Sequence, residues 1–271
     1  MDFTISLEQQ ASLLSMEAFN VKASMQAVTR VFPSFARNVQ DKLKTFLATE
    51  PPMIPAVKPL SMAKLKNINF AAHRKTQVYG PLGLKVTYGE YLHALDASID
   101  VVTQLQEKQV GALTQFANGL LAEPGRFNSA RSDKPVLPFG EDTIVECRKK
   151  IDKCVDRAST QSIHEYGKLF RNNTEVHITT EQVNGMIDRY LRVNREELIQ
   201  SVADCVDVLE RMADRLEHDD SFKPNGATLS ALTQGILTTA KLVEFFSVTG
   251  FLLAEVAGCV QETNKGVERL A

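Results

Sequence analysis

Residues 227–260, ATLSALTQGILTTAKLVEFFSVTGFLLAEVAGCV, are the stretch that decides the fold class. Their apolar and small residues recur every three or four positions, from Leu229 through Ile236 and Val243 to Val260. This spacing places one apolar stripe along a helix, ready to pack against a neighbouring helix. The pattern therefore predicts a single long helix from about residue 227 to residue 269.

The same three-and-four spacing predicts helices through most of the chain. The first follows an unbroken stripe from Leu7 to Phe32 and begins with a capping box of Ser6 and Gln9. Further helices are predicted over about 34–48, 61–70, 89–121, 142–170 and 179–218, the last beginning with a capping-box pattern of Thr179 and Gln182. Together these segments cover roughly 70% of the chain, about twice the usual share of helix. We therefore expect an all-α fold built as an elongated antiparallel bundle of long helices.

The N-terminal part of this bundle is interrupted by proline. Four prolines between Pro51 and Pro59 remove backbone donors and restrict the backbone, which predicts a stiff, extended connector. Residues 76–87 contain Gly80 and Pro81 and predict a loop or a small hairpin, the only β structure expected. We expect three parts: an N-terminal helical pair (1–50), a proline-rich basic connector (51–88) and a long-helix bundle (89–271).

Composition limits the class of protein. The 271 residues are 44% hydrophobic and carry a net charge of −2, values that are typical of a folded chain and exclude a disordered one. The N-terminus has no basic segment followed by an apolar core, so we expect no signal peptide and a cytoplasmic location at synthesis. The most apolar window, Leu242–Val260, contains Glu244 and Glu255. Each carboxylate would cost up to about 3 kcal/mol near a bilayer centre, so a buried helix is favoured over a membrane span.

Motifs that carry catalysis are incomplete. Ser61 and Lys64 have the Ser-x-x-Lys spacing of a serine nucleophile, but the companion motifs of that chemistry are missing. The five histidines are scattered, and Glu90 with His93 supplies only one copy of the Glu-x-x-His spacing that a di-iron bundle needs twice. The four cysteines form no Cys-x-x-Cys pair and are expected to be small buried residues. We therefore expect no catalytic site, no metal, no cofactor and no small-molecule substrate.

Charge is distributed unevenly along the chain. Residues 51–89, which we call the basic segment, contain no acidic residue, whereas residues 179–220 contain eleven acids against five arginines. Three interpretations remain open: the basic segment lies against the acidic helix of its own chain, it binds another copy, or it binds nucleic acid. The candidate partner-binding residues of the basic segment are Lys64, Lys66, His73, Arg74, Lys75 and Lys85.

A second candidate surface lies on the last predicted helix. Gly250, Ala254 and Gly258 recur every four residues and form what we call the small-residue groove. Such spacing lets another backbone approach closely, which would offset the cost of about 1 kcal/mol for each glycine in a helix. We therefore expect added bulk, such as Ala254→Leu, to disrupt packing or assembly.

In its helix-rich texture across most of its length, the chain resembles the helical virion structural proteins of large tailed bacteriophages, without sharing a diagnostic motif. The resemblance implies a particle component that meets other virion proteins, and packaged DNA as a further contact. The sequence thus favours a non-catalytic structural or assembly subunit that associates with other subunits, including its own copies. The alternative is a regulatory module that binds nucleic acid or a host protein through the basic segment. An enzyme with an inward-facing carboxylate site is the third hypothesis, to which the spacing of the acids gives little support.

Overall fold

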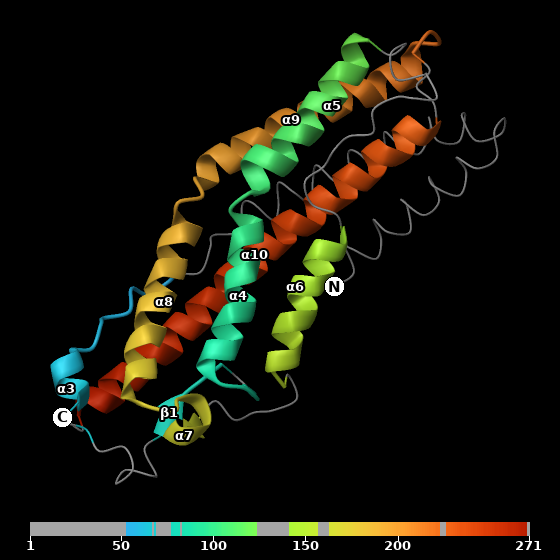
Figure 1. Ribbon diagram of the computed structural model, residues 1–271. Helices are drawn as coiled ribbons and strands as arrows, with labels where there is room; N and C mark the ends of the chain where they lie inside the picture. The colour runs from blue at the N-terminus through green and yellow to red at the C-terminus, as the bar shows by residue number, and fades with distance from the viewer. Residues whose placement is uncertain are drawn as a thin grey trace. The chain divides into compact units, whose positions relative to one another are not determined.

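The computed structural model describes residues 53–66, 68, 77–81, 83–123, 141–156, 163–222 and 226–269. These residues are mostly helical, which confirms the all-α class (Figure 1). The two N-terminal helices predicted over residues 1–48 lie outside the described residues. In chain order the elements are α3 (Met62–Lys66), β1 (Gln77–Tyr79), α4 (Tyr88–Val102), the π-helix η1 (Leu105–Val110), α5 (Gly111–Ala122), α6 (Glu141–Cys154), β2 (Ile163–Glu165), α7 (Tyr166–Leu169), α8 (Asn173–Leu191), α9 (Arg195–His218) and α10 (Gly226–Glu268).

The chain divides into two compact units, each made of segments that are distant in sequence. Unit 1 includes Gln104–Asp142 and Asn194–Glu244, and unit 2 comprises Pro51–Thr103, Thr143–Val193 and Phe245–Ala271. Helix α10 contributes its first part to unit 1 and its second part to unit 2.

Unit 2 is held together by four helices that alternate in direction along the chain. Helix α6 runs antiparallel to α4, since the amide of Lys85, just before α4, donates a hydrogen bond to the carbonyl oxygen of Cys154 at the end of α6. Helix α8 runs parallel to α4, because Arg189 near the end of α8 bonds to Asp96 and Asp100 in the second half of α4. The remainder of α10 runs antiparallel to α8, as Tyr190 and Thr180 bond to Phe246 and Asn264 respectively. The α4–α8 pair therefore differs from the antiparallel neighbours expected from the sequence.

Unit 1 contains a second parallel pair, α5 and α9, and η1, which directly precedes α5, also contacts α9. Arg215 near the end of α9 donates a hydrogen bond of 2.7 Å to the carbonyl oxygen of Leu121 at the end of α5. The same guanidinium lies over the ring of Phe222, 4.6 Å from its centroid, and bonds to Asp219. Arg215 thus fastens the C-terminal ends of both helices.

The prediction of one helix over 89–121 was wrong. Helix α4 ends at Val102, and the chain passes through Thr103 and Gln104 into η1 before α5 begins. A π-turn accommodates one extra residue, which rotates the face that follows it. The interruption falls where two glutamines break the apolar stripe, and it leaves Gln109 fully buried.

The prediction of one helix over 142–170 was also wrong. Helix α6 ends at Cys154 because its last carbonyl group accepts a hydrogen bond from the amide of Lys85. Val155 then forms a bridge with Leu84, and β2 pairs with β1 in antiparallel register, Tyr79 opposite Ile163. The β structure expected within 76–87 is therefore no local hairpin, since its partner strand lies about 85 positions further along the chain.

The helix predicted over 179–218 is two helices with an earlier start. The side chain of Asn172 accepts a hydrogen bond from the amide of Glu175, so α8 begins at Asn173, while Thr179 lies buried inside it. Asn194 caps α9 in the same way, through the amide of Glu197. The predicted capping box at Thr179 was therefore wrong, since asparagine supplies both caps. The helix predicted over 61–70 is shorter, ending at Lys66.

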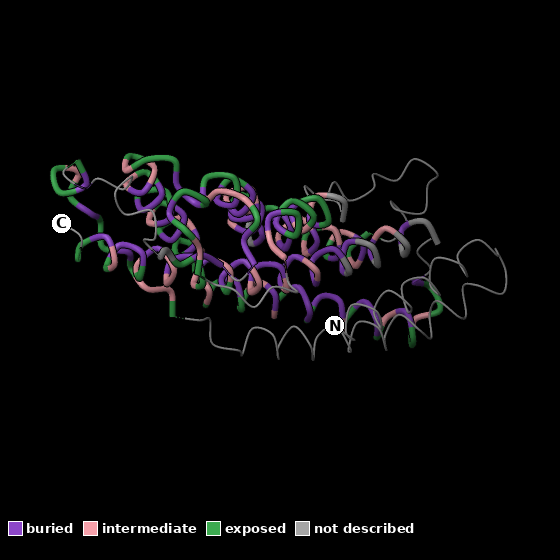
Figure 2. The backbone as a smooth tube through the Cα atoms, turned by 90° about the horizontal axis from the view of Figure 1, so that it is seen from below, coloured by how far each residue is buried: buried purple, intermediate pink, exposed green. Residues whose placement is uncertain are grey.

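Burial follows the amphipathic pattern along each helix (Figure 2). In α10, Leu242, Val243, Leu253 and Val256 are fully buried, whereas Phe251 is exposed. Within the described residues, Thr238–Glu268 is the single helical stretch that is long and apolar enough, at a mean hydropathy of 1.6, to cross a membrane. Half of its most apolar window is buried inside the protein. A core helix of a folded protein passes the same test of length and hydropathy.

Candidate interaction surface

The structure separates the candidate residues of the basic segment. Lys64 and Lys66 lie exposed on α3, which packs on the N-terminal end of α8. Asn173 holds this contact by donating hydrogen bonds of 2.6 and 3.1 Å to the carbonyl groups of Leu65 and Ile68. His73, Arg74 and Lys75 lie outside the described residues.

Lys85 lies apart from α3, just before α4. Its amide bonds to Cys154, and its ammonium group lies 3.8 Å from the carboxylate of Asp156. Both side chains of this pair are about half exposed, so their attraction is weak. The acid that Lys85 meets therefore follows α6 and does not belong to residues 179–220.

The residues of the small-residue groove have different surroundings. At Gly250 the close neighbour is the ring of Tyr190 from α8, whose Cζ would lie 2.9 Å from a Cβ added at that position. Ala254 is half-buried, and a Cβ at Gly258 would meet nothing within 4 Å. At Gly250 a side chain of the same chain therefore occupies the space that the small residue leaves.

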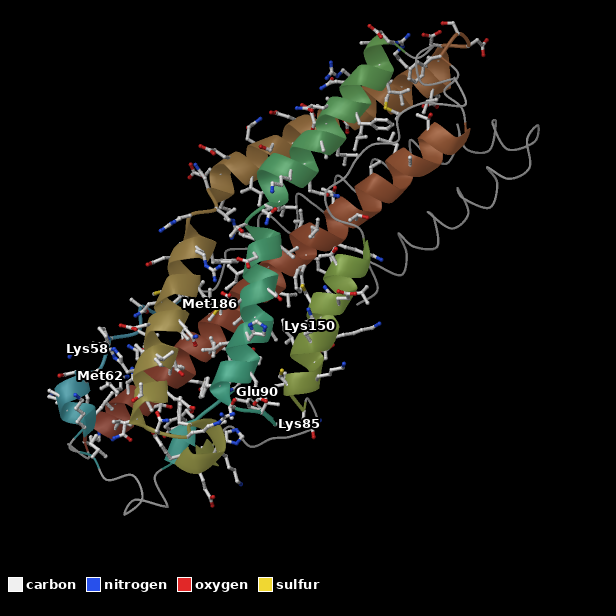
Figure 3. All side chains as sticks on the ribbon, viewed as in Figure 1. Lys58, Met62, Lys85, Glu90, Lys150 and Met186 are labelled. Carbon is white, nitrogen blue, oxygen red and sulfur yellow. The ribbon has the colours of Figure 1, made fainter. Side chains whose placement is uncertain are left out.

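An open cleft lies between α4 and α8 on unit 2. It measures about 430 Å³, and we call it the α4–α8 cleft. It is lined by Gly89, Leu92, His93 and Asp96 from α4 and by Gln182, Gly185, Met186 and Arg189 from α8. Leu92 and Met186 are almost fully buried and form its floor, whereas His93 and Gln182 are exposed at its rim. Figure 3 labels Met186 on α8 beside α4.

Two glycines keep this cleft open. A Cβ added at Gly185 would meet nothing within 4 Å, and one at Gly89 would meet only the hydroxyl oxygen of Thr87, at 4.0 Å. Gly89 follows the start of α4, where Thr87 and Glu90 form a reciprocal capping box. Thr87 and Glu90 are sufficient to cap the helix, so capping does not require glycine at position 89. The absence of a side chain at Gly89 instead leaves space in the cleft.

Charged side chains close one end of the cleft. The guanidinium of Arg189 bonds to one carboxylate oxygen of Asp96 and, at 2.7 Å, to one of Asp100. The two carboxylates remain 43% and 59% exposed, and each has a second oxygen. One cation therefore lies between two anions at this end of the cleft.

The thiols of the chain are poor candidates for chemistry. Burial raises the pKa of Cys205 to about 11 and, together with the nearby charge of Glu255, raises the pKa of Cys259 to about 12. Thiols in such surroundings stay protonated and unreactive near neutral pH. Among the described residues, no group of three His, Cys, Asp or Glu side chains is placed to hold a metal ion.

The chain shows no significant similarity to a known protein family, to a curated protein or to a solved structure. Its surface must therefore be interpreted from its own geometry.

Sequence reasoning missed the α4–α8 cleft, although part of its signal is visible. Gly89, His93, Asp96 and Asp100 recur at three- and four-residue intervals and so share one face of α4. A polar stripe with glycine at one end indicates a surface, but not a hollow. The hollow requires Gly185 on the facing helix, and no local pattern pairs these two segments.

Proposed function

We propose that the chain is a non-catalytic structural or assembly subunit that binds other protein subunits of a larger complex. The observation that carries this proposal is the α4–α8 cleft, which has an apolar floor of Leu92 and Met186 between charged and polar rims. Holes between helices of this kind accept side chains from a packing partner. A buried apolar contact surrounded by polar groups is also the usual anatomy of a protein interface.

The proposal extends to the arrangement and location of the molecule. It includes an elongated antiparallel bundle for the chain as a whole, synthesis in the cytoplasm and, by the resemblance to helical virion proteins, assembly into a phage particle. Small-angle scattering tests the first point directly. A radius of gyration close to about 18 Å, the value for a compact chain of this length, would contradict the elongated bundle.

The central test measures the size of the native protein in extracts of the cells that make it. An assembly subunit sediments in a species well above its own mass of 30.1 kDa. Nuclease treatment of a matched extract separates protein assembly from association with nucleic acid. Sedimentation as a free monomer in both extracts would contradict the proposal.

The basic segment supports a second function, as a regulatory module that binds nucleic acid or a host protein. Lys64 and Lys66 are exposed on α3 and form no ion pair with another described residue. Phosphate contacts would make DNA affinity fall steeply between about 50 and 200 mM salt. The double variant Lys64→Glu with Lys66→Glu should then abolish DNA binding. Unchanged DNA affinity in this variant would show that α3 does not bind DNA.

A further inference from the structure

A proline-rich stretch of unit 2, residues 53–60, lies on α8 and α10, and we call it the proline arm. Figure 1 shows it as the blue trace that leads past α8 to α3. The arm forms neither helix nor strand, and its burial recurs at every third residue. The buried or half-buried residues are Ile54, Val57 and Leu60, whereas one exposed edge carries Met53, Ala56 and Pro59. A polyproline II helix has three residues per turn, so the arm rests on the protein along one edge.

The proline arm is held through its main chain by side-chain amides. The amide of Asn184 on α8 accepts a hydrogen bond of 3.2 Å from the N–H of Val57 and donates one of 2.8 Å to the carbonyl oxygen of the same residue. Asn264 on α10 donates hydrogen bonds of 3.1 Å to the carbonyl oxygen of Lys58 and to the hydroxyl oxygen of Thr180 (Figure 3 labels Lys58). We call Asn184, Thr180 and Asn264 the arm site. Because its bonds to the arm go to backbone atoms, the site accepts an extended segment, and the buried residues at every third position provide selectivity.

Few polar groups fasten the proline arm. In the described part of the chain, the hydrogen bonds between residues 53–60 and the helices come from Asn184 and Asn264 alone. Asn264 is only 4% exposed, yet its Oδ1 atom has no hydrogen-bond partner within the described residues. Met53, at the far end of the arm, is 86% exposed. A buried acceptor without a donor makes this contact weaker than a fully paired one, which favours release of the arm.

We propose that the arm site of one copy binds the proline arm of a second copy in place of its own. A second copy fits the site because its arm has the sequence that the site already holds. It supplies the same backbone bonds and the same buried residues, Val57 and Leu60. Exchange of identical segments keeps these contacts and links two chains. This inference rests on the proposed assembly function and names a contact for it.

The proline arm is long enough to reach a neighbouring copy. Its eight residues, at about 3.1 Å each in a polyproline II conformation, extend about 25 Å from α3. During the exchange α3 stays on its own α8, because Asn173 bonds to Leu65 and Ile68 independently of the arm. Two copies whose arm sites lie within this reach exchange arms reciprocally and form a closed dimer, whereas one-way exchange adds copies in a row.

A synthetic peptide with the sequence of residues 51–60, PPMIPAVKPL, tests the proposal on the wild-type protein. An excess of this peptide should occupy the arm site and dissociate the self-associated protein into monomers, which sedimentation velocity measures. The control peptide carries Val57→Asp, which would bury a charge in the site, and it should leave the assembly intact. An assembly that the wild-type peptide does not dissociate, or that both peptides dissociate equally, overturns the proposal.

Two variants of the full chain separate the arm from the site. Val57→Asp damages the arm and leaves the arm site intact, whereas Asn184→Ala removes two hydrogen bonds from the site and leaves the arm intact. Each variant alone should self-associate roughly tenfold more weakly than the wild type, or less. In an equimolar mixture the intact arm of one variant meets the intact site of the other, so a heterodimer should form.

Two further substitutions are the matched controls. Met53→Asp changes an exposed residue of the arm, and Asn118→Ala removes an exposed amide from α5. Both variants should self-associate like the wild type. Thermal unfolding shows whether Val57→Asp and Asn184→Ala remain folded, and the peptide experiment decides the question without them if they do not.

The outcomes separate this inference from the proposed function. A wild-type protein that stays monomeric when pure overturns the inference, and the size of the native complex in extracts still decides the assembly function. Self-association that survives in either folded variant, Val57→Asp or Asn184→Ala, assigns assembly to another surface and overturns the inference. A mixture of the two folded variants that forms no heterodimer overturns it as well. Dissociation by the wild-type peptide alone, together with association in the mixture, confirms it.

Discussion

The ring of Tyr190 on α8 lies against Gly250 on α10. Its hydroxyl group donates a hydrogen bond of 3.0 Å to the carbonyl oxygen of Phe246, and the two aromatic rings stack with centroids 4.8 Å apart. The ring is therefore held by a hydrogen bond and by stacking, so it cannot move aside to admit a larger neighbour.

This relationship predicts that Gly250→Ala destabilises unit 2. The added methyl group would lie 2.9 Å from the Cζ atom of Tyr190, which real structures do not tolerate. Overpacking costs about 1–3 kcal/mol, which exceeds the gain of about 1 kcal/mol for alanine over glycine in a helix. Chemical denaturation measures the difference.

Gly258→Ala is the matched control on the same helix. A Cβ there meets nothing within 4 Å, so only the helix-propensity gain remains and the variant should be up to about 1 kcal/mol more stable. Equal effects of the two substitutions would show that Tyr190 does not determine the tolerance at Gly250.

Gly83 supports a second prediction, because it is the one described residue with a positive φ, at 69°. Its carbonyl group accepts a hydrogen bond of 2.7 Å from the amide of Asp156, and an added Cβ would lie 2.8 Å from the carbonyl carbon of the same residue. Left-handed backbone costs a residue with a side chain about 1–2 kcal/mol, and the clash adds to that.

We therefore expect Gly83→Ala to lower the free energy of unfolding by more than about 2 kcal/mol. The substitution should also loosen the bridge between Leu84 and Val155, which hydrogen exchange at neighbouring amides would detect. Gly167→Ala serves as the control, since that position is open. A stability change below about 0.5 kcal/mol at Gly83 would contradict the strain argument.

Uninterrupted periodicity was sufficient to predict the longest helix. Helix α10 runs from Gly226 to Glu268, within one residue at each end of the predicted 227–269. Its apolar stripe continues through forty residues, and the Pro224-Asn225-Gly226 sequence before it is typical of a turn. No competing local signal arises along the stretch, so pattern and structure agree.

The breaks within the other long helices depend on contacts that no local pattern contains. Helix α6 ends where the carbonyl group of Cys154 accepts a hydrogen bond from the amide of Lys85, some seventy positions earlier in the chain. The strands β1 and β2 have three residues each, too few for an alternating pattern to be recognised, and they pair across a similar distance. The α4–α8 cleft has the same origin, since Gly89 and Gly185 form a hollow only after their helices pack.

Gln109 supports the prediction that one substitution makes the protein more stable. Its side chain is fully buried in η1, and neither amide atom has a hydrogen-bond partner within the described part of the chain. An unsatisfied buried polar group costs about 1–3 kcal/mol. Gln109→Met keeps the length and volume of the side chain and removes the amide, so it should raise the free energy of unfolding by about 1 kcal/mol or more.

Gln115→Met is the matched control for this substitution, because Gln115 is exposed on α5 and should change stability by less than about 0.5 kcal/mol. A large loss of stability in Gln109→Met would show that the amide has a partner, and would make η1 a polar site in its own right.

Asp219 at the C-terminal end of α9 predicts a specific dependence of stability on pH. Its carboxylate accepts hydrogen bonds from the hydroxyl and the amide of Ser221 and from the guanidinium of Arg215, and these bonds lower its pKa to about 2. The pKa in the unfolded chain is near the ordinary value of about 3.9. A carboxyl group whose pKa is lower in the folded state stabilises that state fully above its unfolded pKa, and this contribution is lost as pH falls toward the folded pKa.

The stabilisation from Asp219 should therefore be present above about pH 4 and disappear between about pH 4 and pH 2. Asp219→Asn cannot ionise, so the stability gap between wild type and this variant should be constant near neutral pH and narrow across that window. Denaturant unfolding at several pH values measures the gap, with the exposed neighbour in Asp220→Asn as the control. A gap that stays constant down to pH 2 would show that the carboxylate of Asp219 does not fasten the end of α9, and the contact of Arg215 with Leu121 would then hold α5 and α9 together without it.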